Sequence, residues 1–281
     1  MLMVKLSLST GVAVALSTAA HAEPWHVEPS LLLGVENFDY HEDVQAPLQS
    51  KHYGNQPTGR MEVLVTSPDG RWYARAWFGL TGGTMPFVGS DQLGNPITPV
   101  DDAEGHMTDS ELDLGYRWNA IHDRLYLGGY LGVGRRTWDR DLRPIGAGGY
   151  REDYAWFAYP VSLVVEYRIT PVWTASLEAT AVIAFVGTMR VHLSDFDPRY
   201  SDADLGLNNR PDARLRLNSG YAISDRLKIV AEATFEESYM VAGPDTVLLV
   251  DGAPTNPVMK ASEPETHTRR ISLLAGASYR F

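Results

Sequence analysis

The 281-residue chain has no cysteine, which excludes disulfides as a source of its stability. Beyond residue 22 it has no stretch approaching 18 uncharged apolar residues, which excludes a helical membrane anchor there. Basic residues are in the minority, and a formal net charge of −11 argues against general nucleic-acid binding. A mean hydropathy of −0.20 suits a soluble protein, but it equally suits a membrane barrel, because lipid-facing and lumen-facing residues alternate and average out.

The amino-terminal segment has the pattern of a signal peptide. Lys5 supplies positive charge, residues 6–20 are apolar or small, and Ala20-His21-Ala22 fits the small-x-small cleavage rule. The apolar run is too short, and too rich in Ser, Thr and Ala, to make a convincing membrane helix. We therefore expect residues 1–22 to be a cleaved signal peptide and residues 23–281 to form one domain. A buried first helix is the alternative.

The rest of the chain repeats segments of alternating polarity, typical of strands with one apolar and one polar face. The last segment, Ile271 to Phe281, ends on an aromatic residue; an ordinary amphipathic strand of a soluble β protein is its alternative explanation. Strands are predicted at 27–40, 58–66, 71–81, 109–119, 125–140, 152–168, 172–193, 212–222, 227–240 and 267–281. The long connections are 41–57, 82–108, 141–151, 194–211 and 241–266, and the other four are short. This asymmetry predicts an all-β fold: a membrane-spanning antiparallel up-and-down β-barrel of about ten strands, with short periplasmic turns and five long extracellular loops.

Aromatic residues on the apolar phase fall near the two ends of the predicted strands. Phe78, Phe157, Tyr159, Phe185 and Phe235 lie toward the long connections. Two aromatic girdles around an aliphatic band are what a bilayer interface selects. The predicted girdle beside the short turns consists of Trp72, Tyr116, Trp118, Tyr167, Trp173, Tyr221, Tyr279 and Phe281.

The opposite phase places charged residues inside the predicted barrel. Charges of mixed sign persist in a narrow lumen only when they are paired. Eight strands leave just enough space for side chains, and porins with an aqueous channel have sixteen or more. Ten strands therefore predict a lumen closed by ion pairs, with a narrow conducting channel as the alternative. The predicted lumen residues are Arg60, Glu62, Arg75, Glu111, Asp113, Arg117, Arg136, Glu178, Arg190, Arg214, Arg216, Glu232, Glu236 and Arg270.

The strand count, the alternation and the aromatic carboxy-terminus together resemble the omptins, the ten-stranded outer-membrane proteases of Gram-negative bacteria. The layout matches best from Asp109 through Asp197: strand, short turn, Gly-rich strand, loop, two long strands and an acidic loop. Residues 136–141 and Gly149-Tyr150 are also similar to a wider group of outer-membrane barrels. The resemblance implies the barrel fold and a location in the cell outer membrane.

Omptins cut with an Asp pair on one loop wall and an Asp-His pair on the other, and this chain departs from both. The 82–108 segment has Asp91 and the adjacent Asp101-Asp102 but no Asp-x-Asp, and the 194–211 segment has no Asp-x-His. A water-activating dyad needs a His nitrogen and a carboxylate within reach of one site. If the chain is a protease, the catalytic candidates are His192, Asp195 and Asp197.

The 194–211 segment also offers oxygen ligands for Ca²⁺. Asp195, Asp197, Asp202 and Asp204 lie within ten residues, but the spacing lacks the Gly and terminal Glu of an EF-hand. A solvated acidic loop is the alternative. No phosphate-binding loop, exposed-serine motif or zinc-binding His pair appears in the sequence, and no cofactor is predicted.

These patterns predict a monomeric, non-enzymatic outer-membrane barrel with a closed lumen and loops that serve a binding or structural role. Its expected surroundings are outer-membrane lipid and lipopolysaccharide, with the barrel-assembly machinery as a partner of the carboxy-terminal strand and no nucleic-acid partner. An omptin-like endopeptidase and a narrow channel for small solutes are the alternatives.

Overall fold

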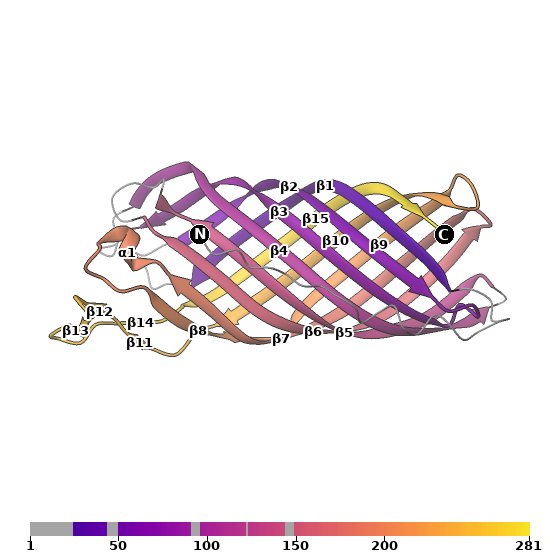
Figure 1. Cartoon of the computed structure of the whole chain (residues 1–281). Helices are drawn as coiled ribbons and strands as arrows, with labels where there is room; N and C mark the ends of the chain where they lie inside the picture. Colours follow the sequence, from indigo (N-terminus) through magenta and orange to yellow (C-terminus); the bar gives the residue numbers. More distant parts are fainter. Residues whose placement is uncertain (1–24, 44–49, 91–95, 122, 144–148) are drawn as a thin grey trace.

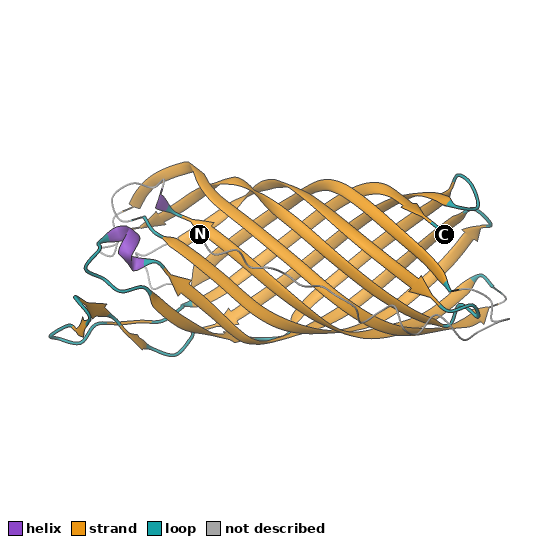
Figure 2. Ribbon diagram, viewed as in Figure 1, coloured by secondary structure: helices purple, strands orange, loops and turns teal. Residues whose placement is uncertain are grey.

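The computed structural model describes residues 25–43, 50–90, 96–121, 123–143 and 149–281, so the predicted signal peptide 1–22 lies outside the described residues. The described chain forms a closed barrel of tilted antiparallel strands (Figures 1 and 2). No helix among these residues is long and apolar enough to span a membrane. The elements are β1 (His26–Asp43), β2 (Ser50–Thr66), β3 (Trp72–Ser90), β4 (Pro96–Ile121), β5 (Leu125–Asp141), β6 (Arg151–Thr170), β7 (Trp173–Val191), α1 (Leu193–Phe196), β8 (Ala203–Asn209), β9 (Asp212–Ala222), β10 (Leu227–Val241), β11 (Thr246–Val247), β12 (Leu249–Val250), β13 (Ala253–Pro254), β14 (Lys260–Ala261) and β15 (Glu265–Tyr279).

The barrel has ten staves, which confirms the predicted fold class. The main sheet counts eleven strands, but β8 and β9 both pair with β7 and with β10, one after the other along them, so together they make one stave. The barrel closes through β15, which pairs with β10 on one side and with β1 on the other. Closure leaves no free sheet edge, as a bilayer requires.

Short turns gather at one end of the barrel, near the carboxy-terminus (Figure 1). In the 67–71 turn, the Gly70 amide donates to the Ser67 carbonyl at 2.8 Å, and Gly70 takes a φ of 70° that favours glycine. This is the periplasmic end in barrels of this kind, and the opposite end is extracellular.

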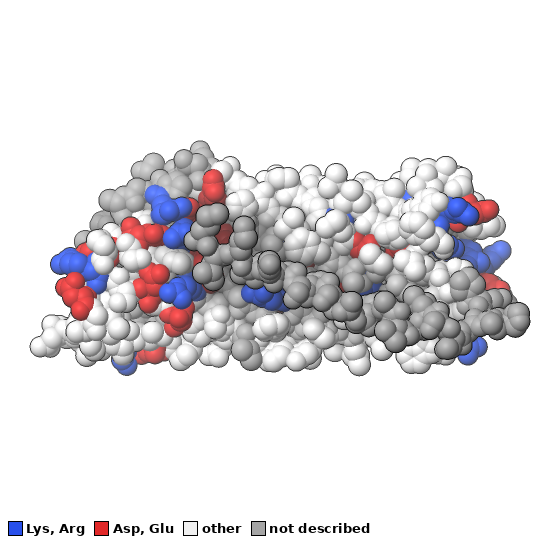
Figure 3. Space-filling model, in the orientation of Figure 1, with Lys and Arg blue, Asp and Glu red and all other residues white. Residues whose placement is uncertain are grey.

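An apolar band surrounds the middle of the barrel. The outward phase is strongly exposed there, with Leu163 at 73% and Leu131 at 65%. Charged side chains gather at the two ends of the face shown in Figure 3, and few appear in the band between them. An exposed apolar belt of this kind is the surface of a barrel that spans lipid.

Aromatic side chains lie where both predicted girdles place them. All five residues toward the extracellular end are exposed, and so are Trp72, Trp118, Tyr167, Trp173, Tyr221, Tyr279 and Phe281 at the other. Tyr116 is half-buried because its ring packs against Trp72 at a centroid distance of 5.0 Å.

The long extracellular loops are the main departure from the predicted architecture. Strands continue through much of the predicted loops: within the 82–108 connection, β3 runs on to Ser90 and β4 begins at Pro96. Above the membrane the polarity of the two faces reverses: Phe38, Tyr40 and Met85 point inward and are fully buried, while the outer face is polar. The predicted strand ends were wrong on this side because the prediction followed lipid-facing apolar residues, whereas the outer face of these strand extensions is in water.

Candidate functional site in the barrel lumen

A buried ion-pair network fills the lumen at membrane depth. In its layer nearest the periplasmic end, Arg75 donates to Glu178 and to Asp113, each at 2.9 Å. Tyr130 donates a short hydrogen bond to Glu178, and Arg216 Nη1 lies 3.5 Å from the same carboxylate. All five side chains are buried, and each comes from a different strand. The network therefore joins opposite walls of the barrel.

A second set of pairs lies around the indole of Trp77. Arg60 pairs with Glu232, and Arg214 holds Glu111 through contacts of 2.8 and 3.0 Å. The guanidinium carbons of Arg60 and Arg214 lie 4.7 and 5.7 Å from the Trp77 ring, close enough for cation–π attraction. The indole therefore interacts with guanidinium groups from two opposite walls of the barrel.

The layer nearest the extracellular side joins five strands and adds β1 and β15 to the network. Arg136 makes a bidentate pair with Glu236 and approaches Asp109 at 3.2 Å. Arg270 donates to Glu36 at 2.9 Å and to Asp109 at 2.9 Å. Bidentate pairs fix geometry, and removing one partner of a buried pair costs about 3–5 kcal/mol. The network is therefore a rigid plug.

Thirteen of the fourteen predicted lumen residues face the interior, and most belong to this network. Glu62 and Arg117 lie on the wall of a cavity described below. The prediction missed Glu36, Asp109, Asp212 and Trp77. Each lies on the inward phase of its strand, so the alternation itself could have identified them.

Arg190 is the exception and lies on the outer surface, 52% exposed. The pairing of β6 with β7 runs from Ala155 opposite Thr188 to Phe157 opposite Phe185, which leaves one extra residue on β7. Such a bulge reverses the faces of all later residues of the strand. The inward placement predicted for Arg190 was wrong for this reason.

The extracellular end of the lumen is closed by a packed core with a charged centre. Phe38, Tyr40, Met85, Trp138 and Tyr154 belong to one buried cluster. Trp138 stacks on Tyr154 at 5.0 Å.

Arg140, fully buried in the same region, donates to Glu42 at 3.0 Å and to Glu152 at 2.9 Å. Glu263 accepts from the Tyr154 hydroxyl at 3.1 Å and from that of Tyr40 at 3.4 Å. Burial, together with Glu42 and Glu152, raises the pKa of Glu263 well above its usual range.

The candidate catalytic residues do not meet as predicted. His192 lies between Asp153, with Nε2 2.8 Å from Oδ2, and Asp202, with Nδ1 3.1 Å from Oδ2. Asp195 instead pairs with Arg151 at 2.9 Å, and this hydrogen bond lowers the pKa of Asp195. Asp197 pairs with Arg199 at 2.6 Å.

The remaining acidic candidates are likewise separated. Asp202 accepts from the Ser194 hydroxyl at 2.7 Å, and Asp204 lies 3.6 Å from Arg190. No group of three or more His, Asp or Glu in the described residues could hold a metal ion, so the four candidate aspartates are not brought together as Ca²⁺ ligands. Asp91 lies outside the described residues, as do the side chains of Asp101 and Asp102.

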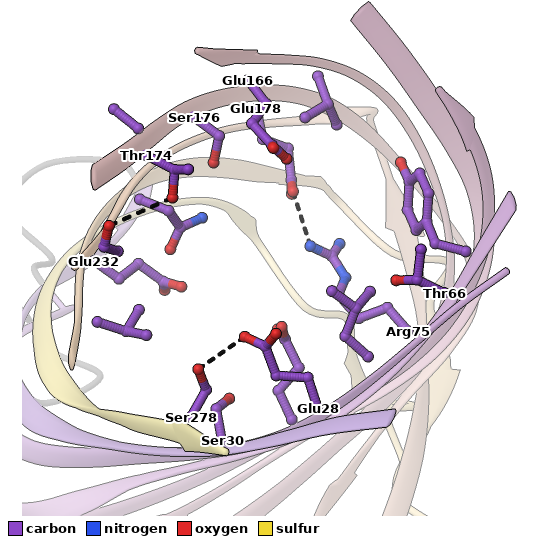
Figure 4. A pocket seen from close by; sticks show the side chains of 18 of the residues that line it. Glu28, Ser30, Thr66, Arg75, Glu166, Thr174, Ser176, Glu178, Glu232 and Ser278 are labelled. Atoms are coloured by element: carbon purple, nitrogen blue, oxygen red, sulfur yellow. Dashed lines mark hydrogen bonds and ion pairs between the residues drawn. The ribbon is translucent and has the colours of Figure 1, made fainter. Parts of the chain in front are cut away.

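The lumen has a cavity below the plug and another within it. The one below the plug, about 210 Å³, is bordered by Ser30, Tyr73, Glu166 and Ser176 among others (Figure 4). The smaller, about 30 Å³, lies between the upper layers beside Trp77. These two cavities share no lining residue.

No protein-family model matches the chain, and no curated protein sequence matches it. Among solved structures, the chain is similar to the outer membrane protease OmpT from Escherichia coli, at 12% identity and a TM-score of 0.63, over 94% of this chain and 100% of that one. It also matches the translocator domain of the autotransporter NalP from Neisseria meningitidis, at 14% identity and a TM-score of 0.42, over 93% and 90% of the two chains. The toluene transporter TodX from P. putida matches at 10% identity and a TM-score of 0.39, over 92% and 90%. The likeness to OmpT shows that the fold is that of an outer-membrane β-barrel.

Proposed function

We propose that this protein is a non-enzymatic barrel of the cell outer membrane that conducts no solute and acts through its extracellular extension. The observation that carries the proposal is the ion-pair plug, whose layers join strands on all sides of the lumen. A packed core above the plug adds a second barrier. A barrel whose lumen is closed in this way suits a binding or structural protein of the cell surface.

The surroundings of the barrel are part of the proposal. The apolar belt would contact membrane lipid, and the charged outer face above it would meet lipopolysaccharide. The carboxy-terminal strand, with Phe281, would be the segment read by the barrel-assembly machinery. Because the barrel closes on itself through β1 and β15, it needs no second copy to satisfy its edges, and we propose that it is a monomer.

Single-channel recording in a planar bilayer tests the closed lumen. The wild type should be silent, and the double variant Glu111→Ala/Arg214→Ala should show conductance steps because it removes the pair across the middle of the plug. The control Asp39→Ala/Arg269→Ala removes a pair on the outer face and should stay silent. Stable steps from the wild type would overturn the proposal and favour a narrow channel.

An endopeptidase is the second candidate, and the geometry of His192 favours it. A histidine held between Asp153 and Asp202 has the partners of a general base. The folded protein should then cleave a fluorogenic peptide library, and His192→Ala should abolish cleavage while Glu237→Gln, which removes the carboxylate beside His267, leaves it unchanged. Absence of cleavage by the wild type, or full activity of His192→Ala, would reject this candidate.

A further inference from the structure

The cavity below the plug is accessible and lined by polar side chains, as a ligand-binding site would be. It opens toward the periplasmic end through a wider mouth of about 450 Å³, with which it shares Glu28, Lys228 and Ser278. Figure 4 shows hydroxyl and carboxylate side chains from opposite walls, among them Ser176 and Ser278, pointing into the central space. A molecule can therefore enter from the periplasm and meet polar groups on several sides.

Carboxylates outnumber cations on the walls of this cavity. The acidic lining residues are Glu28, Glu62, Glu166, Glu178 and Glu232. The basic lining residues are Arg75, Arg117 and Lys228. Arg60 and Arg216 of the plug also hold Glu232 and Glu178, so the attraction of this site for a cation depends on which carboxylates remain without a contacting cation.

Most of these carboxylates are already neutralised by a cation of the protein. Lys228 lies 2.7 Å from Glu28, and Arg117 lies 3.0 Å from Glu166. Glu178 and Glu232 belong to the plug. Glu62 is different, because it makes no ion pair and no side-chain hydrogen bond within the described chain, although it lies on the inward face of β2 and is half-buried. Its charge acts on Arg60 and Arg75 at longer range, but both of these arginines are in contact with other carboxylates.

Aromatic rings complete the lining. Arg75 lies 4.4 Å above the ring of Tyr130 and Arg117 lies 5.4 Å above that of Tyr126, so two rings already bind cations of the protein. Tyr73 carries no such cation in the described residues and lies nearer the mouth. Because Glu62 pairs across the sheet with Trp77, four residues along from Tyr73, the two side chains start about 13 Å apart along the strands.

We propose that this cavity binds a small organic ammonium ion from the periplasm, with the charged nitrogen at Glu62 and the apolar body toward Tyr73. The carboxylate would supply the charge-assisted hydrogen bond and the tyrosine would supply the apolar face. A neutral molecule of the same shape would leave Glu62 without its partner.

Calorimetric titration of the folded protein in detergent tests the proposal with two matched probes, phenethylammonium and 2-phenylethanol. Phenethylammonium should bind, and the alcohol should bind at least tenfold more weakly, because it cannot form the charge-assisted hydrogen bond to Glu62. Glu62→Gln should weaken phenethylammonium binding about tenfold and leave the alcohol unaffected. Tyr73→Ala should weaken both probes.

The matched control is Glu104→Gln, which removes the same charge from the exposed outer face of β4 and should change nothing. Equal binding of the two probes, no loss in Glu62→Gln, or no binding by the wild type would each overturn the proposal. Heat-modifiable migration on gels verifies that each variant is folded. The conductance of the barrel is measured separately, so failure here leaves the closed-lumen proposal intact.

Discussion

At the scale of single residues, the protein concentrates charge in two places that water does not reach freely. One is the plug, where each carboxylate has arginine partners. The other is the extracellular core, where Glu42, Glu152 and Glu263 lie around Arg140. The first arrangement is balanced and the second has an excess of carboxylates, so substitutions should act differently in the two.

In the plug, Arg214→Ala should destabilise the barrel by about 3–5 kcal/mol, because Glu111 remains buried without its main partner. The apolar double variant Arg214→Met/Glu111→Leu should recover most of this loss. Urea unfolding in lipid vesicles measures both. Lys260→Ala removes an exposed pair with Asp245 and should cost at most about 1 kcal/mol. An equally small effect of Arg214→Ala would mean that the network adds little stability.

In the extracellular core, Glu263→Gln should stabilise the protein at pH 8 and have little effect at pH 5. The pKa of Glu263 is raised in the folded state, so the folded protein binds its proton more tightly than the unfolded chain does. Stability is then lost as the pH rises from the usual carboxyl range through the raised pKa, and glutamine removes that loss. Thermal unfolding followed by circular dichroism across this range checks the prediction. A pH-independent difference between variant and wild type would contradict it.

At the scale of elements, each long strand has a lower part facing lipid and an upper part facing water. In β7 the change coincides with the bulge opposite residues 155–157, after which Met189 is buried and Arg190 is exposed. The bulge keeps apolar residues toward lipid below and toward the core above. The bulge therefore allows the same strand to present an apolar face to lipid in its lower part and a polar face to water in its upper part.

Cysteine labelling along β7 tests this reversal. Leu177→Cys should react with a lipid-soluble maleimide and Ser176→Cys should be protected from it, whereas Thr188→Cys should react with a water-soluble reagent and Met189→Cys should not. The native chain has no cysteine, so each signal comes from one position. Leu273→Cys on β15 is a second lipid-facing control. Labelling of Met189→Cys in place of Thr188→Cys would exclude the bulge.

The sequence predicted the membrane-spanning part of these elements well and the extracellular part poorly. Alternation identified ten strands and their faces because lipid imposes an apolar exterior on residues such as Leu131 and Leu163. Above the bilayer the outer face of the barrel is in water, so apolar residues such as Met85 and Phe87 point inward, and an apolar outward phase no longer identifies the strands there. The pairing of charges was not predictable either, because Arg136 and Glu236 meet across the lumen from positions 100 residues apart.

At the scale of the whole molecule, the barrel is sealed by the pairing of its last strand with its first. Ser30 to Asp43 pair with residues 265–278, and beyond them the Phe281 amide donates to the Val27 carbonyl at 3.0 Å. The Phe281 ring packs on Tyr279 at 4.9 Å and is 75% exposed at the periplasmic rim. The end of the chain thus presents an aromatic pair to the membrane interface and contributes little to the interior.

Deleting Phe281 should therefore reduce assembly in cells more than it reduces the stability of the folded barrel. One backbone hydrogen bond and an exposed ring are lost, which should cost about 1–2 kcal/mol in unfolding measurements. If the terminal ring is a recognition feature for assembly, the folded fraction in outer-membrane preparations should fall several-fold, and Phe281→Tyr should restore it. Deletion of exposed Phe196 from α1 is the matched control and should leave assembly unchanged. Normal assembly without Phe281 would show that β15 is recognised without its terminal ring.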